Sequence, residues 1–253
     1  MRLAILIPLL SCSIGFAAGP SELLWSDGFS GPAGSPPDIG KWTYDRGNGG
    51  DGWGNHELEF YTDTPEQVSL DGKGHLAIRA SREAGRLVSS RIKTEGKFEF
   101  RYGKVEARIR LPFGQGIWPA FWMLGANIAT SGWPACGEID IMENIGREPS
   151  TIHATLHGPG YSGKKGISGS FSLPARTRFS DHFHVFSADW SPDSVQFSVD
   201  GIAYHRVIRQ NLPPGLPWVF DHPFFLLLNL AVGGDWPGRP DATTSFPQTM
   251  LGA

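Results

Sequence analysis

Apolar residues recur at every second position in several parts of the chain, and this alternation limits the fold more than any other feature. Leu76, Ile78 and Ala80 stand at every second position, and polar residues separate the apolar ones in residues 105–111 and 195–199. A period of two places the apolar side chains on one face of a strand and the polar side chains on the other. These three segments are therefore predicted to be half-buried strands of antiparallel sheets.

Two further signals extend this pattern. Asp200-Gly201 is a hairpin turn signal, and residues 202–207 are predicted to be the returning strand. Residues 224–232 are almost all apolar, with Asn229 inside the run, which predicts a central strand covered on both faces. The 33 glycines and 20 prolines suit short strands joined by tight turns. We predict an all-β sandwich of two packed antiparallel sheets.

Length and charge narrow the class of protein. At 253 residues, the chain suits one large all-β domain, and we place that domain at residues 20–253. No internal repeat or low-complexity linker divides these residues. The formal net charge is -3, with no basic cluster, so we expect no nucleic-acid partner and no strongly anionic polysaccharide. A neutral glycan fits this charge better.

Residues 1–19 have the features of a secretory signal peptide. Arg2 supplies a positive charge, a short apolar stretch follows, and small residues surround Ala17. The apolar stretch is too short to span a bilayer, so we predict a secreted or periplasmic protein without a membrane span. Residues 9–12 also resemble a bacterial lipoprotein cleavage box. Lipid anchoring at Cys12, at the cell surface, is the alternative interpretation.

Three carboxyl groups lie within six residues of one otherwise apolar segment. In a strand, Glu138 and Asp140 share one face, while Ile139 and Ile141 point into a core. Glu143 is then out of phase with the other two acids. A β-bulge near Ile141-Met142, which adds one residue to the strand, would return Glu143 to the carboxylate face.

Carboxyl groups at this spacing repel one another unless at least one keeps its proton. A pair of this kind divides into a proton donor and a nucleophile, which is the arrangement that glycoside hydrolysis uses. The alternative is that the acids form the solvent-exposed face of an edge strand. We favour catalysis because like charges on one face destabilise a strand unless they serve a function.

Several motifs, in order along the chain, carry a family resemblance. The sequence from Leu24 to Gln248 resembles glycoside hydrolase family 16, and in particular its endo-β-1,3-glucanase (laminarinase) branch. The signature of this branch is a bulged Glu-x-Asp-x-x-Glu strand, which residues 138–143 match. The other matching blocks are residues 52–58, 96–107, 114–124, 153–160 and 229–234.

The resemblance implies a β-jelly-roll sandwich with a concave substrate cleft and a retaining, double-displacement reaction. Glu138 is the expected nucleophile, Glu143 the general acid and then base, and Asp140 the neighbour that holds a hydrogen bond to Glu138. Retaining hydrolysis needs the two reacting carboxyl groups about 5–5.5 Å apart. On this basis we predict a secreted endo-β-1,3-glucanase that hydrolyses laminarin-type β-glucans.

The same resemblance implies a set of substrate-binding residues. Aromatic rings stack on the apolar faces of sugars, and fixed polar groups bind hydroxyls. Core packing is the alternative role for the tryptophans, and pairing with an acid is the alternative for the arginine. We assign no substrate-binding role to Glu57 at this stage, and we interpret His153 as structural. His157 is expected to support Glu143 or to contact the sugar. The predicted binding residues are Asn55, Arg91, Trp118, Trp122, Trp133, His157 and Trp236.

Catalysis is predicted to need no metal or other cofactor, since no close ligand spacing such as His-Glu-x-x-His occurs. The resemblance implies a structural calcium near the first strand in many relatives, but Gly28 stands where an acid is common, so we disfavour calcium here. Cys136 is interpreted as a buried filler. The resemblance also suggests that the last C-terminal strand of the family is absent, with a cost in stability.

Several alternatives stay open at this stage. Within the family, they are a mixed-linkage β-1,3-1,4-glucanase, a galactan hydrolase and a transglycosylase. Outside the enzymes, a glycan-binding module would keep the tryptophans but would not need the three acids. We expect a monomer whose partner is a neutral β-glucan polysaccharide.

Overall fold

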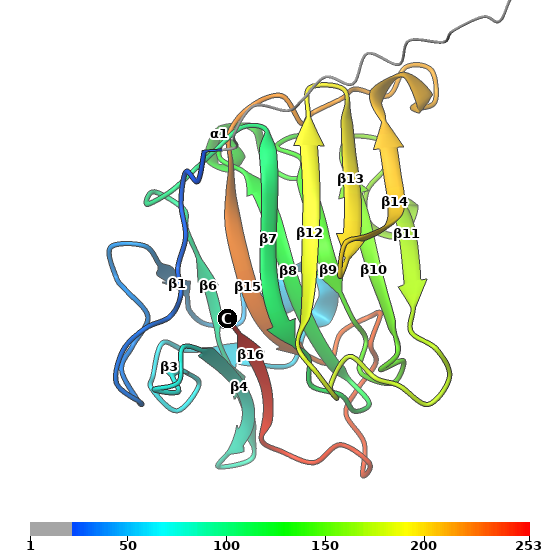
Figure 1. The fold of residues 1–253 in the computed structure, drawn as a ribbon. Helices are drawn as coiled ribbons and strands as arrows, with labels where there is room; N and C mark the ends of the chain where they lie inside the picture. The colour runs from blue at the N-terminus through cyan, green and yellow to red at the C-terminus, as the bar shows by residue number, and fades with distance from the viewer. Residues whose placement is uncertain (1–21) are drawn as a thin grey trace, which may run out of the picture.

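Two stacked β-sheets make up most of the protein, so the predicted all-β sandwich is confirmed. The computed structural model describes residues 22–253, and the predicted signal peptide and Cys12 lie outside the described residues. Figure 1 shows the sheet that contains β7, β12 and β13 in front of the sheet that contains β8, β9 and β10. We call the rear sheet sheet one and the front sheet sheet two.

Sheet one has seven strands, and every adjacent pair in it is antiparallel. All nine residues of β15, which pairs with β6 and β8, are buried, as the apolar run predicts. In order across the sheet, the strands are β1 (Thr43–Asp45), β6 (Arg91–Lys93), β15 (Phe224–Val232), β8 (Ile117–Gly125), β9 (Glu138–Glu143), β10 (Thr151–His157) and β11 (Ile167–Ser172).

Sheet two has nine strands, and a hairpin turn at Asp200-Gly201 joins β13 to β14 as predicted. One pair, β2 and β5, is parallel, which the alternation of apolar residues does not specify. In order, the strands are β14 (Ile202–Ile208), β13 (Ser194–Val199), β12 (His184–Ser191), β7 (Gly103–Arg110), β16 (Gln248–Gly252), β4 (Leu76–Glu83), β5 (Arg86–Ser89) and β2 (Phe60–Tyr61), while β3 (Val68–Leu70) pairs with β4.

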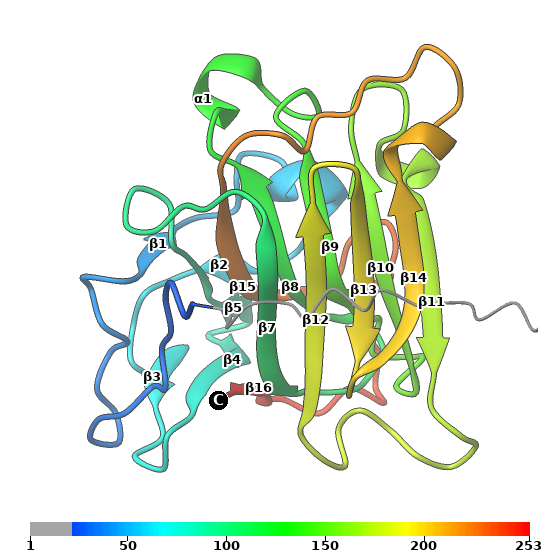
Figure 2. The same cartoon turned by 45° about the horizontal axis from the view of Figure 1, so that its top comes forward.

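The helical segments are short and lie in loops, as Figure 2 shows for α1 at the top of the molecule. No helix within residues 22–253 has the length and apolar character needed to cross a membrane. The segments are η1 (Gly52–His56), α1 (Ile128–Ser131), η2 (Gly163–Lys165) and η3 (Arg209–Asn211).

The last described residues form strand β16 (Gln248–Gly252). Strand β16 lies between β4 and β7. It pairs with β4 over five residues but with β7 only through Leu251 and Gly252. The backbone N–H of Ala253 adds one hydrogen bond to the carbonyl of Arg108. The chain end therefore joins the two halves of sheet two.

The core fills the space between the sheets. Ile139 and Ile141 of sheet one and Ile109, Phe186 and Phe197 of sheet two are among its buried side chains. Burial of each side chain of this size stabilises the folded state by about 1.5–3 kcal/mol, because apolar surface is removed from water. Because alternate residues of each strand enter this core, the remaining residues face outward, and the outer face of sheet one carries the predicted acids.

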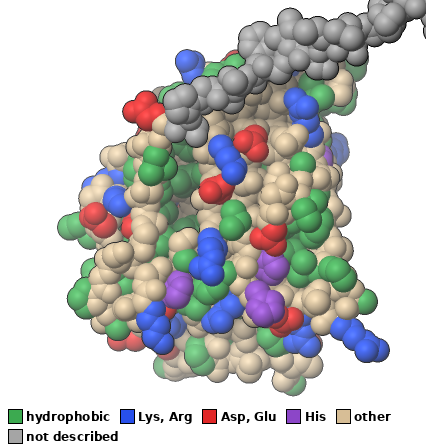
Figure 3. Space-filling model, viewed as in Figure 1, with side chains coloured by type: hydrophobic (Ala, Val, Ile, Leu, Met, Phe, Trp, Pro, Cys, Tyr) green, Lys and Arg blue, Asp and Glu red, His purple; other side chains and the backbone are tan. Residues whose placement is uncertain are grey.

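The outer face of sheet two shows no concentration of one charge. Figure 3 views this side of the molecule and shows acidic and basic side chains dispersed over it. On β7, Lys104 and Glu106 form an ion pair with about half of each side chain exposed. Such a surface suits a solvated face, in keeping with the alternation predicted for residues 105–111.

The burial pattern gives a matched test of the two-layer core. Ile109 is fully buried between the sheets, and Ile202 of β14 is 55% exposed. Replacing Ile109 by Ala should lower the free energy of unfolding by about 2–5 kcal/mol, because a cavity forms. Ile202→Ala removes the same atoms and should change it by less than about 0.5 kcal/mol. Urea unfolding measures both, and equal losses would contradict the assigned core.

Candidate active site

A β-bulge in β9 brings the three acids to one face, as the sequence predicts. On β8, Trp122 lies opposite Asp140 and Ala120 lies opposite Glu143. A separation of two residues on β8 therefore matches a separation of three residues on β9. The register with β10 shifts at the same place, where Thr155 lies opposite Asp140 and His153 lies opposite Glu143. The extra residue restores Glu143 to the face of Asp140.

The residues around the acids explain why the bulge forms here. Ile139, Ile141 and Met142 are buried in the core between the sheets. In a regular strand, Met142 would share a face with Glu138 and Asp140, and Glu143 would enter the core. Burial of an unpaired carboxylate in an apolar core costs several kcal/mol, whereas burial of Met142 is favourable. The bulge places each side chain in the environment that suits it.

Glu138 and Asp140 form a pair of neighbouring carboxyl groups, and each affects the pKa of the other. Trp133 Nε1 donates to Glu138 Oε2 at 2.9 Å. His157 Nε2 lies 3.1 Å from Asp140 Oδ2 and 3.7 Å from Glu138 Oε1. Only 18% of the Glu138 side chain and 5% of the Asp140 side chain are exposed. The structure therefore places His157 beside this pair rather than against Glu143.

Glu143 has a separate partner at the other end of the bulge. Trp118 Nε1 donates to Glu143 Oε1 at 3.1 Å. The Trp118 ring meets the edge of Trp236 with their centroids 5.7 Å apart, and His153 packs on Trp236 at 5.0 Å. Arg147, which follows β9, donates to the backbone carbonyl of Trp236 at 2.9 Å. Trp118 and Trp236 therefore form one aromatic group beside Glu143.

Burial and mutual repulsion hold protons on the acids. Desolvation, and then the charge of Asp140, raises the pKa of Glu138 to about 8. Desolvation likewise raises the pKa of Asp140 to about 8, against the hydrogen bond from Glu138. Burial, followed by the charge of Asp140, raises the pKa of Glu143 well above its usual value, against the effects of His157 and the Trp118 N–H. The cluster can thus present a protonated acid and a carboxylate together.

Trp122 and Arg91 lie on the β15 side of the acids. Trp122 Nε1 donates to Asn229 Oδ1 at 2.7 Å. Arg91 is 8% exposed, and its Nε is 2.7 Å from Asp45 Oδ2. Its guanidinium carbon lies 3.9 Å from the centroid of the Trp53 ring and 5.9 Å from that of Trp122. Arg91 thus pairs with an acid and supports the tryptophans beside it.

Asn55 lies in η1, and this segment is hydrogen-bonded to the loop that carries Trp236. Its side chain donates to Glu57 Oε1 at 3.1 Å, and its backbone carbonyl accepts from the N–H of Asp235 at 2.9 Å. His56 and Asp235 also form an exposed ion pair between the two segments. These contacts bring two predicted binding residues, which are far apart in the sequence, to neighbouring loops.

Three buried polar residues near this site were not identified from the sequence. Glu59 and Tyr61 are fully buried, and Asn229 is 6% exposed. Asn229 was noted only as a polar residue inside an apolar run. The available signals were that interruption and the alternation of Glu57, Glu59 and Tyr61 at every second residue. Sequence reasoning could not show that these two segments meet.

One group of side chains has the donor set for a metal ion. Ligand atoms of Glu138, Asp140 and His157 lie within 4.8 Å of one another. Carboxylate oxygens and an imidazole nitrogen suit several divalent ions. The same side chains form the acid pair described above, so a bound ion would compete with their catalytic use.

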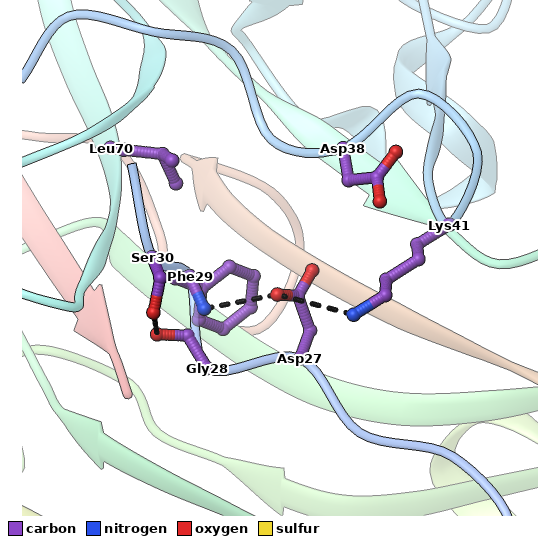
Figure 4. A pocket seen from close by; sticks show the side chains of 7 residues that line it. All are labelled: Asp27, Gly28, Phe29, Ser30, Asp38, Lys41 and Leu70. Carbon is purple, nitrogen blue, oxygen red and sulfur yellow. Dashed lines mark hydrogen bonds and ion pairs between the residues drawn. The ribbon is translucent and has the colours of Figure 1, made fainter. Parts of the chain in front are cut away.

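The position at which the resemblance implies calcium is occupied by other interactions. Asp27, Asp38 and Lys41 line a hollow of about 250 Å³. Figure 4 shows these side chains together with the interactions of Asp27. Asp27 Oδ1 accepts from the N–H of Phe29 at 2.9 Å and lies 3.7 Å from Lys41 Nζ, while Oδ2 accepts from Trp42 Nε1 at 2.8 Å. Both oxygens are engaged and a cation is adjacent, so these residues do not fit a calcium site.

Cys136 lies two residues before Glu138 but is not suited to act as a nucleophile. The thiol is free and the residue is fully buried. Desolvation, and then the charge of Glu138, raises the pKa of Cys136 to about 11, so the thiol stays protonated at neutral pH. Its environment is that of a packing residue.

Comparisons with known proteins agree with the fold. The model of glycosyl hydrolases family 16 matches residues 54–249. A β-glucanase of Rhodothermus marinus is 40% identical over 240 residues, covering 91% of this chain and 82% of that protein. The solved endo-β-1,3-glucanase of Pyrococcus furiosus is 50% identical, with 91% of both chains covered and a TM-score of 0.84. The laminarinase catalytic domain of Thermotoga maritima is 49% identical, covering 91% of this chain and 95% of that one, with a TM-score of 0.86.

The two-sheet fold, the paired acids and these similarities define a glycoside hydrolase. The chain belongs to glycosyl hydrolases family 16. The family resemblance found in the sequence is therefore confirmed, and the acidic strand lies within the matched residues.

The raised pKa values predict a stability that falls as pH rises. Glu138 in the unfolded chain loses its proton near pH 4.5, but in the folded protein it does so near pH 8. Between these values the unfolded state binds fewer protons, so the free energy of unfolding decreases with pH. Glu138→Gln removes this titration and should raise the free energy of unfolding at pH 8 by about 1–3 kcal/mol.

The same variant should show no gain at pH 4, where the glutamate is protonated in both states. Urea unfolding of wild type and Glu138→Gln at several pH values measures the difference. A gain that is equal at pH 4 and pH 8 would contradict the assigned cause.

Proposed function

We propose that this protein is a secreted, retaining endo-β-1,3-glucanase that hydrolyses laminarin-type β-glucans. The observation that carries the proposal is the bulge in β9, which puts Glu138 and Glu143 on one face with Asp140 between them. The linkage is supported by the similar endo-β-1,3-glucanase of Pyrococcus furiosus and laminarinase of Thermotoga maritima. Residues 1–19 support secretion through their sequence features.

In the proposed first step, the Glu138 carboxylate attacks the anomeric carbon while Glu143 gives its proton to the leaving glycosidic oxygen. This forms a covalent glycosyl-enzyme and releases the first product. Trp133 and His157 stabilise the ionised form of Glu138, since the indole N–H donates to it and His157 lowers its pKa. Asp140 takes up the proton that the pair shares.

In the second step, Glu143, now a carboxylate, removes a proton from water, and the water attacks the anomeric carbon. Glu138 leaves as a carboxylate, and the product keeps the β configuration. The high pKa that burial gives Glu143 suits both roles, because the group is a proton donor first and an effective base afterwards.

The aromatic residues support binding of the glucan chain on both sides of the acids. Trp118, Trp122 and Trp236 are partly exposed, and Trp133 is 49% exposed. A sugar ring that stacks on an aromatic ring loses apolar surface to water and keeps its hydroxyls free for hydrogen bonds. The expected cleft would run over this outer face of sheet one. We propose that the protein acts as a monomer and needs no metal or other cofactor.

Substitution of the two reacting glutamates tests the mechanism. Glu138→Gln and Glu143→Gln should each lower kcat on laminarin by at least about a thousandfold, because each removes a group that acts on the reacting bond. Asp189→Asn, on β12 of sheet two, is the control and should keep wild-type activity. Reducing-end assays measure the rates, and NMR of the first product should show the β-anomer. A first product with the α configuration would contradict double displacement.

Product analysis distinguishes the proposed substrate from related ones. Wild-type protein incubated with laminarin, lichenan and agarose should release intermediate-sized oligosaccharides from laminarin first. Greater activity on lichenan would indicate a mixed-linkage enzyme, and activity on agarose a galactan hydrolase. Release of glucose alone would contradict endo action.

Chelation tests whether a metal is needed. Exhaustive dialysis against EDTA should leave kcat on laminarin and the thermal midpoint unchanged, because the proposed reaction uses only carboxyl groups. A fall in kcat that added divalent ions restore would assign a metal to Glu138, Asp140 and His157. A fall in the midpoint alone would indicate a structural ion elsewhere.

A further inference from the structure

A continuous chain of hydrogen bonds connects Trp122 to a buried carboxylate. Trp122 Nε1 donates to Asn229 Oδ1 at 2.7 Å. Asn229 Nδ2 donates to Tyr61 Oη at 3.3 Å, and Tyr61 Oη donates to Glu57 Oε2 at 3.2 Å. We call this chain, together with Glu59 beside Glu57, the polar relay. It crosses from β8 through β15 to β2, so three separate segments of the chain hold it in place.

The relay ends on a pair of buried carboxyl groups. Glu59 is fully buried, and its Oε2 accepts from the backbone N–H of Val232 at 2.7 Å. Glu57 already accepts from Tyr61 and, at its other oxygen, from Asn55. Burial, and then the charge of Glu57, raises the pKa of Glu59 well above its usual value, which favours the protonated form of Glu59. A protonated Glu59 can donate a hydrogen bond to the neighbouring Glu57 carboxylate.

Burial of Glu57 and Glu59 lowers the stability of the fold. Arg91, the cation nearest to Tyr61 in the relay, pairs with Asp45 rather than with either glutamate. Two carboxyl groups buried without a cation destabilise a protein relative to apolar residues of the same size. The pair lies outside the reacting acids on β9, so the glycosidic bond cleavage does not require it. A function in substrate binding accounts for its presence.

The order of donors and acceptors makes the relay directional. An indole N–H can only donate, and a carboxylate can only accept. With Trp122 at one end and Glu57 at the other, the amide of Asn229 and the hydroxyl of Tyr61 each have one possible orientation. The Trp122 ring is then fixed about its side-chain bonds.

We propose that Glu57 and Glu59, acting through Tyr61 and Asn229, are positioning residues that fix Trp122 for stacking against a sugar of the glucan chain. The proposal rests on the proposed function for the identity of the ligand. A ring that is held before binding loses less conformational entropy when the sugar binds, so the relay increases affinity rather than the rate of bond cleavage. Loss of the relay should therefore raise KM, whereas kcat depends on the acids of β9 and should change little.

Tyr61→Phe tests the relay by removing one oxygen atom. The variant breaks the connection between Asn229 and Glu57 while the aromatic ring stays in the core. KM for laminarin should rise about fivefold, as expected for the loss of one hydrogen bond, and kcat should stay within about twofold of wild type. In a Trp122→Phe background, which lacks the indole N–H, adding Tyr61→Phe should change KM by less than about 1.5-fold.

A second pair of variants tests the acid end. Glu59→Gln keeps a donor toward Glu57 and an acceptor for the Val232 N–H, so KM should stay within about twofold of wild type. Glu59→Leu removes both and should raise KM about as much as Tyr61→Phe does. Thermal unfolding of every variant shows whether it is folded at the assay temperature. Should Glu59→Leu fail to fold, Tyr61→Phe and Glu59→Gln still decide the result.

NMR of the indole groups gives a readout that needs no substrate. The Trp122 Nε1–H resonance, assigned by its loss in Trp122→Phe, should shift in Tyr61→Phe and stay in place in Glu59→Gln. An unmoved resonance in Tyr61→Phe, or a KM effect of Tyr61→Phe that persists in full without Trp122, would overturn the proposal. Wild-type protein that does not hydrolyse laminarin refutes the proposed function instead, and the indole resonance still decides the relay.

Discussion

The register of β9 against its two neighbours is the constraint on which the active site depends. Asp140 and Glu143 are three residues apart on β9, whereas their partners are only two residues apart on β8 and on β10. Because β9 is paired on both sides, the extra residue cannot be relieved by a slip of one strand. Met142 enters the core and Glu143 faces outward. Without this step, one of the two reacting carboxyl groups would lie between the sheets.

The acids are held by neutral donors more than by cations. Trp133 and Trp118 each donate one indole N–H to a different glutamate, and His157 Nε2 lies 3.1 Å from Asp140 Oδ2. A nearby arginine would keep all the carboxyl groups ionised, and no proton donor would remain for the leaving oxygen. Indole donors stabilise a carboxylate less strongly, so burial can still raise the pKa values. The arrangement is less stable than an apolar surface, and its stability decreases with pH.

Polar groups away from the acids are also buried and hydrogen-bonded in a fixed arrangement. Arg91 was predicted to bind substrate, with pairing to an acid as the alternative, and it lies against Asp45 beneath the tryptophans. Tyr61 and Asn229 connect Trp122 to Glu57, which lies beside the buried Glu59. Buried polar groups that take no part in the reaction thus hold the tryptophans of the site in place. Such support is expected where a side chain that can rotate about its bonds must bind the ligand in one orientation.

Local patterns in the sequence predicted a large part of the fold and the centre of the site. The apolar run at residues 224–232 matches strand β15 in both of its ends, and the Asp200-Gly201 hairpin is present. The bulge could be predicted because Glu138, Asp140 and Glu143 lie within one strand and their phase is visible in the sequence. The parallel pair of β2 and β5 could not, because a strand of two residues has no measurable period.

The sequence by itself determined what depends on neighbouring residues: strand periodicity, the hairpin turn, and the conflict of phase that forces a bulge beside Glu143. Only the tertiary structure decided which distant segments meet. Tyr61 and Asn229 are 168 residues apart, and His157 lies on a different strand from the acids it contacts. Hydrogen bonds and pKa shifts of buried groups depend on distance and desolvation in space, and these exist only once the two sheets have packed together.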